Sequence, residues 1–136
     1  MQYIKWFEEL GMDDVEQVGG KNASLGEMYR TLTPQGVLIP NGFAITAQGY
    51  SYILSYNNAL EKLQTILSAM NPKDINSLQM SGKMCRDILH KCPLPPDLQE
   101  EILQANQTLI AQYGDSLSLA VRSSATAEDS PEASFA

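Results

Sequence analysis

The stretch that most constrains what this chain can fold into is a pair of glycines followed by a lysine. Gly19 and Gly20 precede Lys21 and an apolar stripe with helical spacing, so the pattern predicts a helix that the glycine pair opens. The first backbone N–H groups of a helix lack internal partners and carry partial positive charge. Glycine lets a ligand approach this backbone closely, and Lys21 adds a full charge. The stretch therefore suits a phosphate group.

An ordinary glycine turn before a surface helix remains an alternative, because short matches of this kind often arise by chance. A Walker A loop is excluded. That pattern requires a glycine five residues before Gly-Lys and a Ser or Thr after it. Here Gln17-Val18-Gly19 precedes Gly20, and Asn22 follows Lys21.

The bulk composition describes a soluble globular protein. The chain has 136 residues, which corresponds to one domain, with 43% hydrophobic and 18% charged residues. A net charge of −7 argues against non-specific binding to nucleic acid or to an anionic membrane. No signal peptide is visible and no run approaches the ~20 apolar residues of a membrane span. We expect a cytoplasmic monomer.

The two cysteines, Cys85 and Cys92, lie seven positions apart. On a helix this spacing is about 10 Å of rise, too far for a disulfide. It also lacks close metal-ligand spacing, so we interpret both as reduced packing thiols. The one histidine, His90, lies at the margin of the same apolar stripe and is interpreted as an exposed side chain rather than a catalytic one.

The chain is predicted to have an α/β or α+β fold, with about five helices against a small mixed sheet. The first helix is expected over residues 20–32. A second begins after an N-cap at Thr46 and bends or breaks at Asn57-Asn58, and a third runs from 76 or 77 to about 92. The last begins with Pro96 at position N1 and ends with Gly114 at C′. Strands are expected within 3–7, 37–45 and 117–122. The segment 37–45 is interrupted at Pro40-Asn41-Gly42.

A second candidate for anion binding follows the last predicted strand. Arg122 would lie at the carboxyl end of strand 117–122, where ligands of α/β sheets usually bind. The loop after it is rich in hydroxyls, and Ser123, Ser124 and Thr126 could donate to phosphate oxygens. The alternative is a solvated surface loop.

Lys21 and Arg122 are about a hundred positions apart, so the sequence cannot prove that they meet. If they do, Lys21 would act as a point charge and Arg122 as a planar fork, which suits a polyphosphate. Two solvated cations are the alternative. Glu128 and Asp129 are Mg²⁺ ligand candidates by residue type only, and a solvated acidic turn is the simpler interpretation.

Several stretches resemble the N-terminal part of the phosphoenolpyruvate synthase (pyruvate, water dikinase) family. They are Trp6–Val15, Val18–Met28, Gly36-Val37 with Ile39–Thr46, Ala120–Asp129 and Pro131–Ala136. The resemblance covers nearly the whole chain and is weaker from about Asn57 to Gly114.

The resemblance implies the N-terminal subdomain of an ATP-grasp-like domain that binds ATP. In the family, the residues that match Lys21 and Arg122 contact the ATP phosphates. We expect the neighbouring binding residues to be Gly19, Gly20, Asn22, Ser123, Ser124 and Thr126. The family passes the β-phosphate of ATP to a histidine on a swivelling domain and then to pyruvate. The products are phosphoenolpyruvate, AMP and phosphate.

The carrier histidine, the Mg²⁺-binding carboxylates and the pyruvate-binding barrel of the family lie beyond the position of Ala136, and His90 does not match the carrier. The resemblance thus implies that residues 1–136 are a fragment, truncated after Ala136 and inactive alone, whose partners are ATP and the phosphohistidine and pyruvate-binding domains. Rifampin phosphotransferase and a non-catalytic interaction module are alternatives. Pyruvate, phosphate dikinase fits less well, because its arginine loop departs from Ser123–Asp129.

Overall fold

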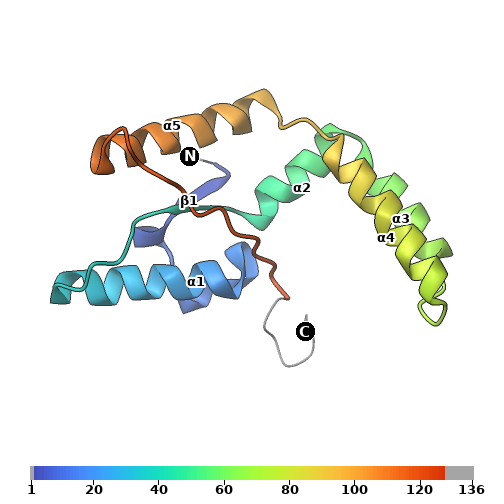
Figure 1. Ribbon diagram of the computed structural model, residues 1–136, viewed down its shortest axis with the longest axis horizontal. Coiled ribbons are helices and arrows are strands. Elements are labelled where there is room, and N and C mark those ends of the chain that lie inside the picture. Colours follow the sequence, from blue (N-terminus) through green and yellow to red (C-terminus); the bar gives the residue numbers. More distant parts are fainter. Residues whose placement is uncertain (1, 128–136) are drawn as a thin grey trace. The chain divides into compact units, whose positions relative to one another are not determined.

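The computed structural model describes residues 2–127 and divides the chain into two compact units. Unit 1 comprises Met1–Gly49 and Asp97–Ala136, and unit 2 comprises Tyr50–Pro96. The elements in chain order are β1 (Ile4–Trp6), η1 (Phe7–Glu9), η2 (Met12–Asp14), α1 (Val15–Leu32), η3 (Thr33–Gln35), β2 (Phe43–Ile45), α2 (Ala47–Tyr56), α3 (Ala59–Ala69), α4 (Ile75–His90) and α5 (Pro96–Tyr113) (Figure 1). The predicted mixture of five helices and a small sheet is confirmed.

The sheet of unit 1 joins two short strands that are far apart in the sequence. β1 and β2 pair antiparallel, with Ile4 opposite Ile45 and Trp6 opposite Phe43. The Trp6 and Phe43 rings meet edge to face, with centroids 5.5 Å apart. Such cross-strand aromatic pairs stabilise a sheet. The strand pair therefore fixes the N-terminal segment beside the residues that follow Pro40-Asn41-Gly42.

The core of unit 1 forms where α1 packs against the turns η1 and η2. Its buried cluster consists of Leu10, Val18, Ala23 and Ala44, with Phe7 and Val15 packed against it. Gly26 of α1 lies directly on Leu10, because a Cβ at position 26 would be 2.4 Å from the Leu10 Cβ. Position 26 of the helix therefore packs closely against the core. The core holds the first half of α1 in place.

Helix α5 belongs to unit 1 from its second residue, Asp97, onward, and it begins and ends as predicted. Pro96 is its first residue, where its missing N–H has no helical partner to lose. Gly114 has a φ of +94° and follows the last residue, and its N–H donates to the Ile110 carbonyl at 2.7 Å. The Glu101 carboxylate accepts hydrogen bonds from the N–H groups of Gln2 and Tyr3, both at 3.0 Å. This contact attaches the start of the chain to α5.

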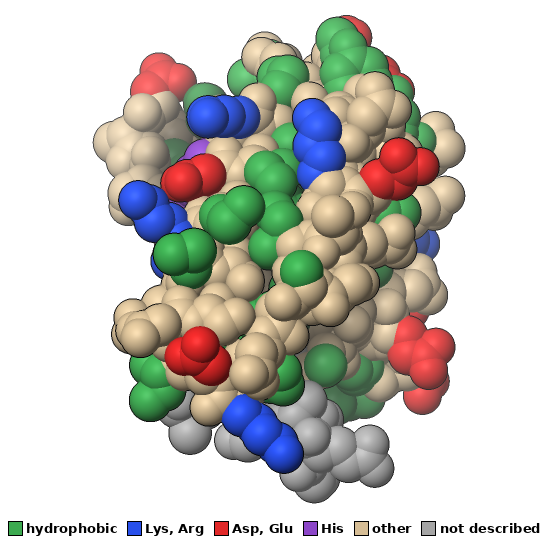
Figure 2. Space-filling model, turned by 90° about the vertical axis from the view of Figure 1, so that its right-hand side faces the viewer, with side chains coloured by type: hydrophobic (Ala, Val, Ile, Leu, Met, Phe, Trp, Pro, Cys, Tyr) green, Lys and Arg blue, Asp and Glu red, His purple; other side chains and the backbone are tan. Residues whose placement is uncertain are grey.

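Unit 2 is built around the antiparallel pair α3 and α4. Its buried cluster of Leu54, Ala59 and Leu63 packs against Cys85, Ile88, Leu89 and Cys92, which confirms the packing interpretation of both cysteines. Asn58 has a φ of +50° between α2 and α3, so the helix breaks at the predicted asparagine pair. Figure 2 views the chain from the side of α3 and α4 and shows hydrophobic side chains exposed among lysine and arginine side chains.

One of the two predicted helix starts at Thr46 and at residue 76 or 77 is confirmed, and the other is shifted. The Gly49 N–H donates to the Thr46 Oγ1 at 3.2 Å, so Thr46 is an N-cap as predicted. The start predicted at 76 or 77 is wrong by one or two residues. Asp74 is the N-cap of α4, because its side chain accepts a hydrogen bond from the Asn76 N–H at 3.0 Å.

One predicted strand and the first part of another are absent from the described residues, whereas residues 43–45 of the predicted segment 37–45 form β2. Residues 37–39 and 117–122 have no strand structure, and the described sheet is antiparallel with two strands rather than mixed. In the second of these segments the apolar side chains of Leu119 and Val121 are 52% and 92% exposed. An alternating pattern forms a strand only when a neighbouring strand pairs with it, and nothing between residues 2 and 127 does so here.

Within the part of the chain that the structure describes, no helix has the length and apolar character needed to cross a bilayer.

Candidate functional site

Helix α1 is interrupted at the predicted glycine pair. Gly19 has φ +80° and ψ 161°, a non-helical conformation inside the range Val15–Leu32. This region of backbone space is essentially restricted to glycine. The regular helix therefore resumes at Gly20, and Lys21 and Asn22 lie in the first turn of the resumed segment. The predicted helix opening at this pair is present, although a preceding short helical turn starts at Val15.

The carbonyl of Val18, just before this interruption, accepts two side-chain hydrogen bonds. The Asn22 amide donates to it at 2.9 Å, and the Ser124 hydroxyl donates to it at 2.8 Å. Ser124 is 106 positions away in the sequence. The serine-rich segment thus lies directly against the start of the resumed helix.

Gly19 makes this approach sterically feasible. A Cβ at position 19 would lie 2.3 Å from the Ser124 Oγ and 2.8 Å from the Ala125 carbonyl oxygen. Real Cβ atoms do not approach other atoms so closely, so a side chain here would push residues 124 and 125 away. In Figure 1 the extended segment after α5 passes β1 and reaches the N-terminal end of α1. The two predicted anion-binding stretches are neighbours in unit 1.

Each of the two predicted cations lies within three positions of one partner of the Ser124–Val18 hydrogen bond. Lys21 is half-buried and follows Gly20, whereas Arg122 is exposed and precedes Ser124 by two positions. Their backbone segments are joined by the Ser124–Val18 hydrogen bond. The arrangement brings a point charge and a planar fork to neighbouring segments, and Lys21 lies in the first turn of the resumed helix, where backbone N–H groups favour an anion.

The remaining candidate residues are distributed as follows. Gly20 is half-buried, and Ser123 and Thr126 are exposed beside the contact. Glu128 and Asp129 lie outside the described residues. His90 is the exposed last residue of α4 in unit 2, outside the unit that holds the contact. Among residues 2–127, no group of three or more His, Cys, Asp or Glu side chains could hold a metal ion.

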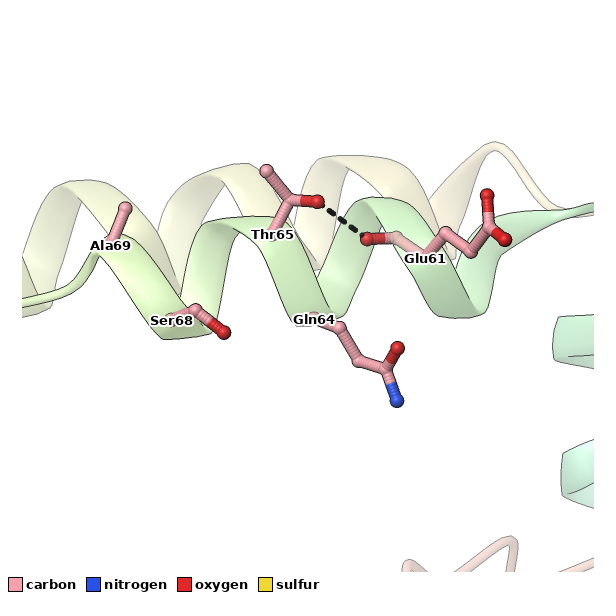
Figure 3. A pocket seen from close by; sticks show the side chains of 5 residues that line it. All are labelled: Glu61, Gln64, Thr65, Ser68 and Ala69. Atoms are coloured by element: carbon pink, nitrogen blue, oxygen red, sulfur yellow. Dashed lines mark hydrogen bonds between the residues drawn. The ribbon is translucent and has the colours of Figure 1, made fainter.

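A surface depression on unit 2 offers no comparable chemistry. It is lined by residues of α3 alone: Glu61, Gln64, Thr65, Ser68 and Ala69. Their side chains leave one helix in different directions (Figure 3), and the Thr65 hydroxyl donates to the Glu61 carbonyl at 2.8 Å. No set of charged groups converges there.

Sequence reasoning did not find two of the contact groups. The Val18 carbonyl is the shared acceptor, and the Ala125 carbonyl packs against Gly19. The four-residue spacing of Val18 and Asn22 is a local signal for a side chain that reaches back to a helix carbonyl. No local signal indicates the contact with Ala125, because backbone carbonyls are the same at every residue.

Comparison with known proteins gives matches over most or all of the chain. The family described as "Pyruvate phosphate dikinase, AMP/ATP-binding domain" matches residues 15–136. The chain is 46% identical over 137 residues to a phosphoenolpyruvate synthase of Helicobacter pylori and 47% identical over 135 residues to one of Neisseria meningitidis. It is 42% identical over 133 residues to a phosphoenolpyruvate synthase of Escherichia coli.

These matches cover 98–100% of this chain but only 17% of each relative. The resemblance to phosphoenolpyruvate synthases seen in the sequence motifs is confirmed over the whole chain, including 57–114, where the motifs fit less closely. The family match includes both the glycine pair with Lys21 and the segment from Arg122 to Thr126. The chain therefore belongs to the pyruvate phosphate dikinase AMP/ATP-binding domain family.

Proposed function

We propose that this chain binds ATP through its phosphates, at the point where the segment 122–126 meets the interruption in α1. The observation that supports this most strongly is the 2.8 Å hydrogen bond between the Ser124 hydroxyl and the Val18 carbonyl. It joins the two stretches that the sequence nominated independently as anion-binding. Membership of an AMP/ATP-binding domain family supports a nucleotide as the ligand.

The proposed division of roles follows from the chemistry of each group. Gly20, Lys21 and Asn22 form the first turn of the resumed helix, where the dipole favours negative charge. The Lys21 ammonium neutralises phosphate charge as a point charge, and the Arg122 guanidinium binds phosphate oxygens as a fork. Gly19 keeps the backbone approachable, and the exposed hydroxyls of Ser123 and Thr126 complete the donors.

The wider reaction belongs to the proposal as well. We propose that residues 1–136 are the N-terminal part of an ATP-grasp-like domain in a cytoplasmic phosphoenolpyruvate synthase. This enzyme would convert ATP, pyruvate and water to phosphoenolpyruvate, AMP and phosphate. Mg²⁺ would accompany ATP and be held by carboxylates outside this chain, beyond the position of Ala136. The phosphohistidine and pyruvate-binding domains would be the partners, so the chain alone would be an inactive monomer.

The names and identities of the relatives favour this reaction over that of rifampin phosphotransferase. Relatives from organisms as different as Aquifex aeolicus and Escherichia coli, at 46% and 42% identity, are both named phosphoenolpyruvate synthase. A stand-alone interaction module has no comparable support.

Calorimetric titration with Mg²⁺-ATP tests the proposal. We expect the unmodified chain to bind ATP weakly, and both Lys21→Ala and Arg122→Ala to weaken binding by about tenfold each, as expected for a charge-assisted hydrogen bond. Lys5→Ala, which removes a cation on β1, serves as the control with unchanged affinity. Equal affinity of all four proteins for ATP would contradict the assignment.

A further inference from the structure

We propose that Ser124 is a positioning residue rather than a phosphate ligand. Its hydroxyl would hold the segment 122–126 against the interruption in α1, so that Arg122 and the exposed hydroxyls face the same anion as Lys21. This inference rests on the proposed ATP-binding function and assigns Ser124 a role different from that of its neighbours.

The donor capacity of Ser124 is the first argument. A serine hydroxyl has one proton to donate, and that of Ser124 is donated to the Val18 carbonyl at 2.8 Å. Ser124 is half-buried, whereas the neighbouring Ser123 and Thr126 are exposed. The geometry thus divides the hydroxyl-rich loop into one side chain that attaches it and two that can reach a ligand.

The acceptor is suited to this role. A carbonyl oxygen has two lone pairs, and the Val18 carbonyl receives one hydrogen bond from Ser124 and one from the Asn22 amide. Val18 itself is 4% exposed and belongs to the core of unit 1. Ser124 therefore attaches the loop to a point that the core fixes. Because Asn22 still occupies the carbonyl when Ser124 is truncated, the helix should keep its local structure.

The position of the attachment explains why it would affect phosphate binding. Ser124 lies two positions after Arg122, and Val18 lies three positions before Lys21. A hydrogen bond between them limits how far the backbones that carry the two cations can separate. Loss of one hydrogen bond of ordinary net strength corresponds to about a threefold to tenfold change in an equilibrium. We expect ATP affinity to fall by that factor when the hydroxyl is removed.

The experiment compares Ser124→Ala, the hydroxyl-retaining Ser124→Thr and the control Ser118→Ala, which changes an exposed serine four positions before Arg122. Amide hydrogen exchange without nucleotide measures the attachment itself. We expect exchange at residues 122–126 to rise about threefold to tenfold in Ser124→Ala, and to change little in the other two. The melting temperature should stay within a few degrees of that of the unmodified chain.

Titration with Mg²⁺-ATP and with adenosine then measures the consequence. Ser124→Ala should weaken ATP binding by the same factor without affecting adenosine, and Ser124→Thr should restore most of the ATP affinity. Unchanged exchange and unchanged ATP affinity in Ser124→Ala would overturn the inference, as would an equal loss for ATP and adenosine. Failure of the unmodified chain to bind ATP would instead overturn the proposed function, and the exchange data would still decide whether Ser124 attaches the loop.

Discussion

The carbonyl oxygen of Ala125 lies 2.8 Å from the position that a Cβ on Gly19 would occupy. Gly19 combines this crowding with φ +80° and ψ 161°, a conformation that is nearly exclusive to glycine. Two independent requirements therefore select glycine at position 19. One is the backbone conformation, and the other is the space taken by residues 124 and 125.

Gly19→Ala is accordingly expected to lower the free energy of unfolding by about 3 kcal/mol or more, as measured by urea denaturation. The unfavourable backbone conformation accounts for about 1–3 kcal/mol, and displacement of the neighbouring segment adds to it. The variant should also lose ATP binding, because residues 124 and 125 can no longer approach.

Gly36→Ala is the control that separates the two causes. Gly36 has φ +86° and ψ 7°, and no atom lies within 4 Å of a Cβ built on it. Gly36→Ala should therefore lower the free energy of unfolding by about 1–2 kcal/mol, the cost of a left-handed backbone at a residue with a Cβ, without a steric clash. If both variants lost the same stability and both still bound ATP, the contact with Ala125 would have no energetic role.

A second prediction concerns two glycines inside helices, Gly26 of α1 and Gly82 of α4. Gly26→Ala should destabilise by about 1–3 kcal/mol, because the added Cβ would be 2.4 Å from the Leu10 Cβ in the core. Gly82→Ala in α4 should instead stabilise by up to about 1 kcal/mol, since its nearest neighbour is the flexible end of the Arg86 side chain at 3.2 Å. A lower melting temperature for Gly26→Ala and a higher one for Gly82→Ala would support the packing of α1 on Leu10. Higher melting temperatures for both variants would refute it.

A third prediction tests the core of unit 2. Leu63 is 8% exposed and belongs to the cluster that packs against α4, whereas Leu60 on the same helix is 48% exposed. Leu63→Ala should lower the free energy of unfolding by about 2–5 kcal/mol, and Leu60→Ala should have a smaller effect. Similar losses at both positions, measured by denaturant titration, would mean that α3 presents a different face to α4.

How far the sequence predicts the fold depends on whether the signal is local. Thr46, Pro96 and Gly114 fix helix ends through their own backbone chemistry, and all three lie where their residue types predicted. The apolar stripe that contains Cys85 and Cys92 likewise lies on a packed face. Periodicity and caps act within a few residues, so they can be read without coordinates.

Strand 117–122 shows where such reasoning fails. Its alternating side chains indicate a tendency to pair, but pairing needs a second strand from elsewhere in a chain. Residues 2–127 supply none, and Val121 is 92% exposed. The periodicity of a segment contains no information about the presence of its partner.

This exposure gives a fourth prediction. Val121→Ala should change the free energy of unfolding by less than about 0.5 kcal/mol, because the side chain has little buried surface to lose. Leu98→Ala in α5, where the leucine is 0% exposed, should lose about 2–5 kcal/mol in the same assay. A large loss at Val121 would show that the segment is packed as a strand after all.

The candidate site was predicted in part. Residue chemistry and family resemblance nominated Lys21 and Arg122 with their neighbours, but the contact between Ser124 and Val18 spans 106 positions and has no local signature. The resulting assignment of phosphate contacts remains a prediction.

The most direct test of whether Lys21 and Arg122 bind the same anion is nuclear magnetic resonance titration of the isotope-labelled chain with Mg²⁺-ATP. The amides of residues 19–22 and of 122–126 should shift together along one binding curve with a single dissociation constant. In the double variant with Lys21→Ala and Arg122→Ala, both sets should stop shifting. Movement of only one set, or two sets with different dissociation constants, would show that the two cations do not serve the same anion.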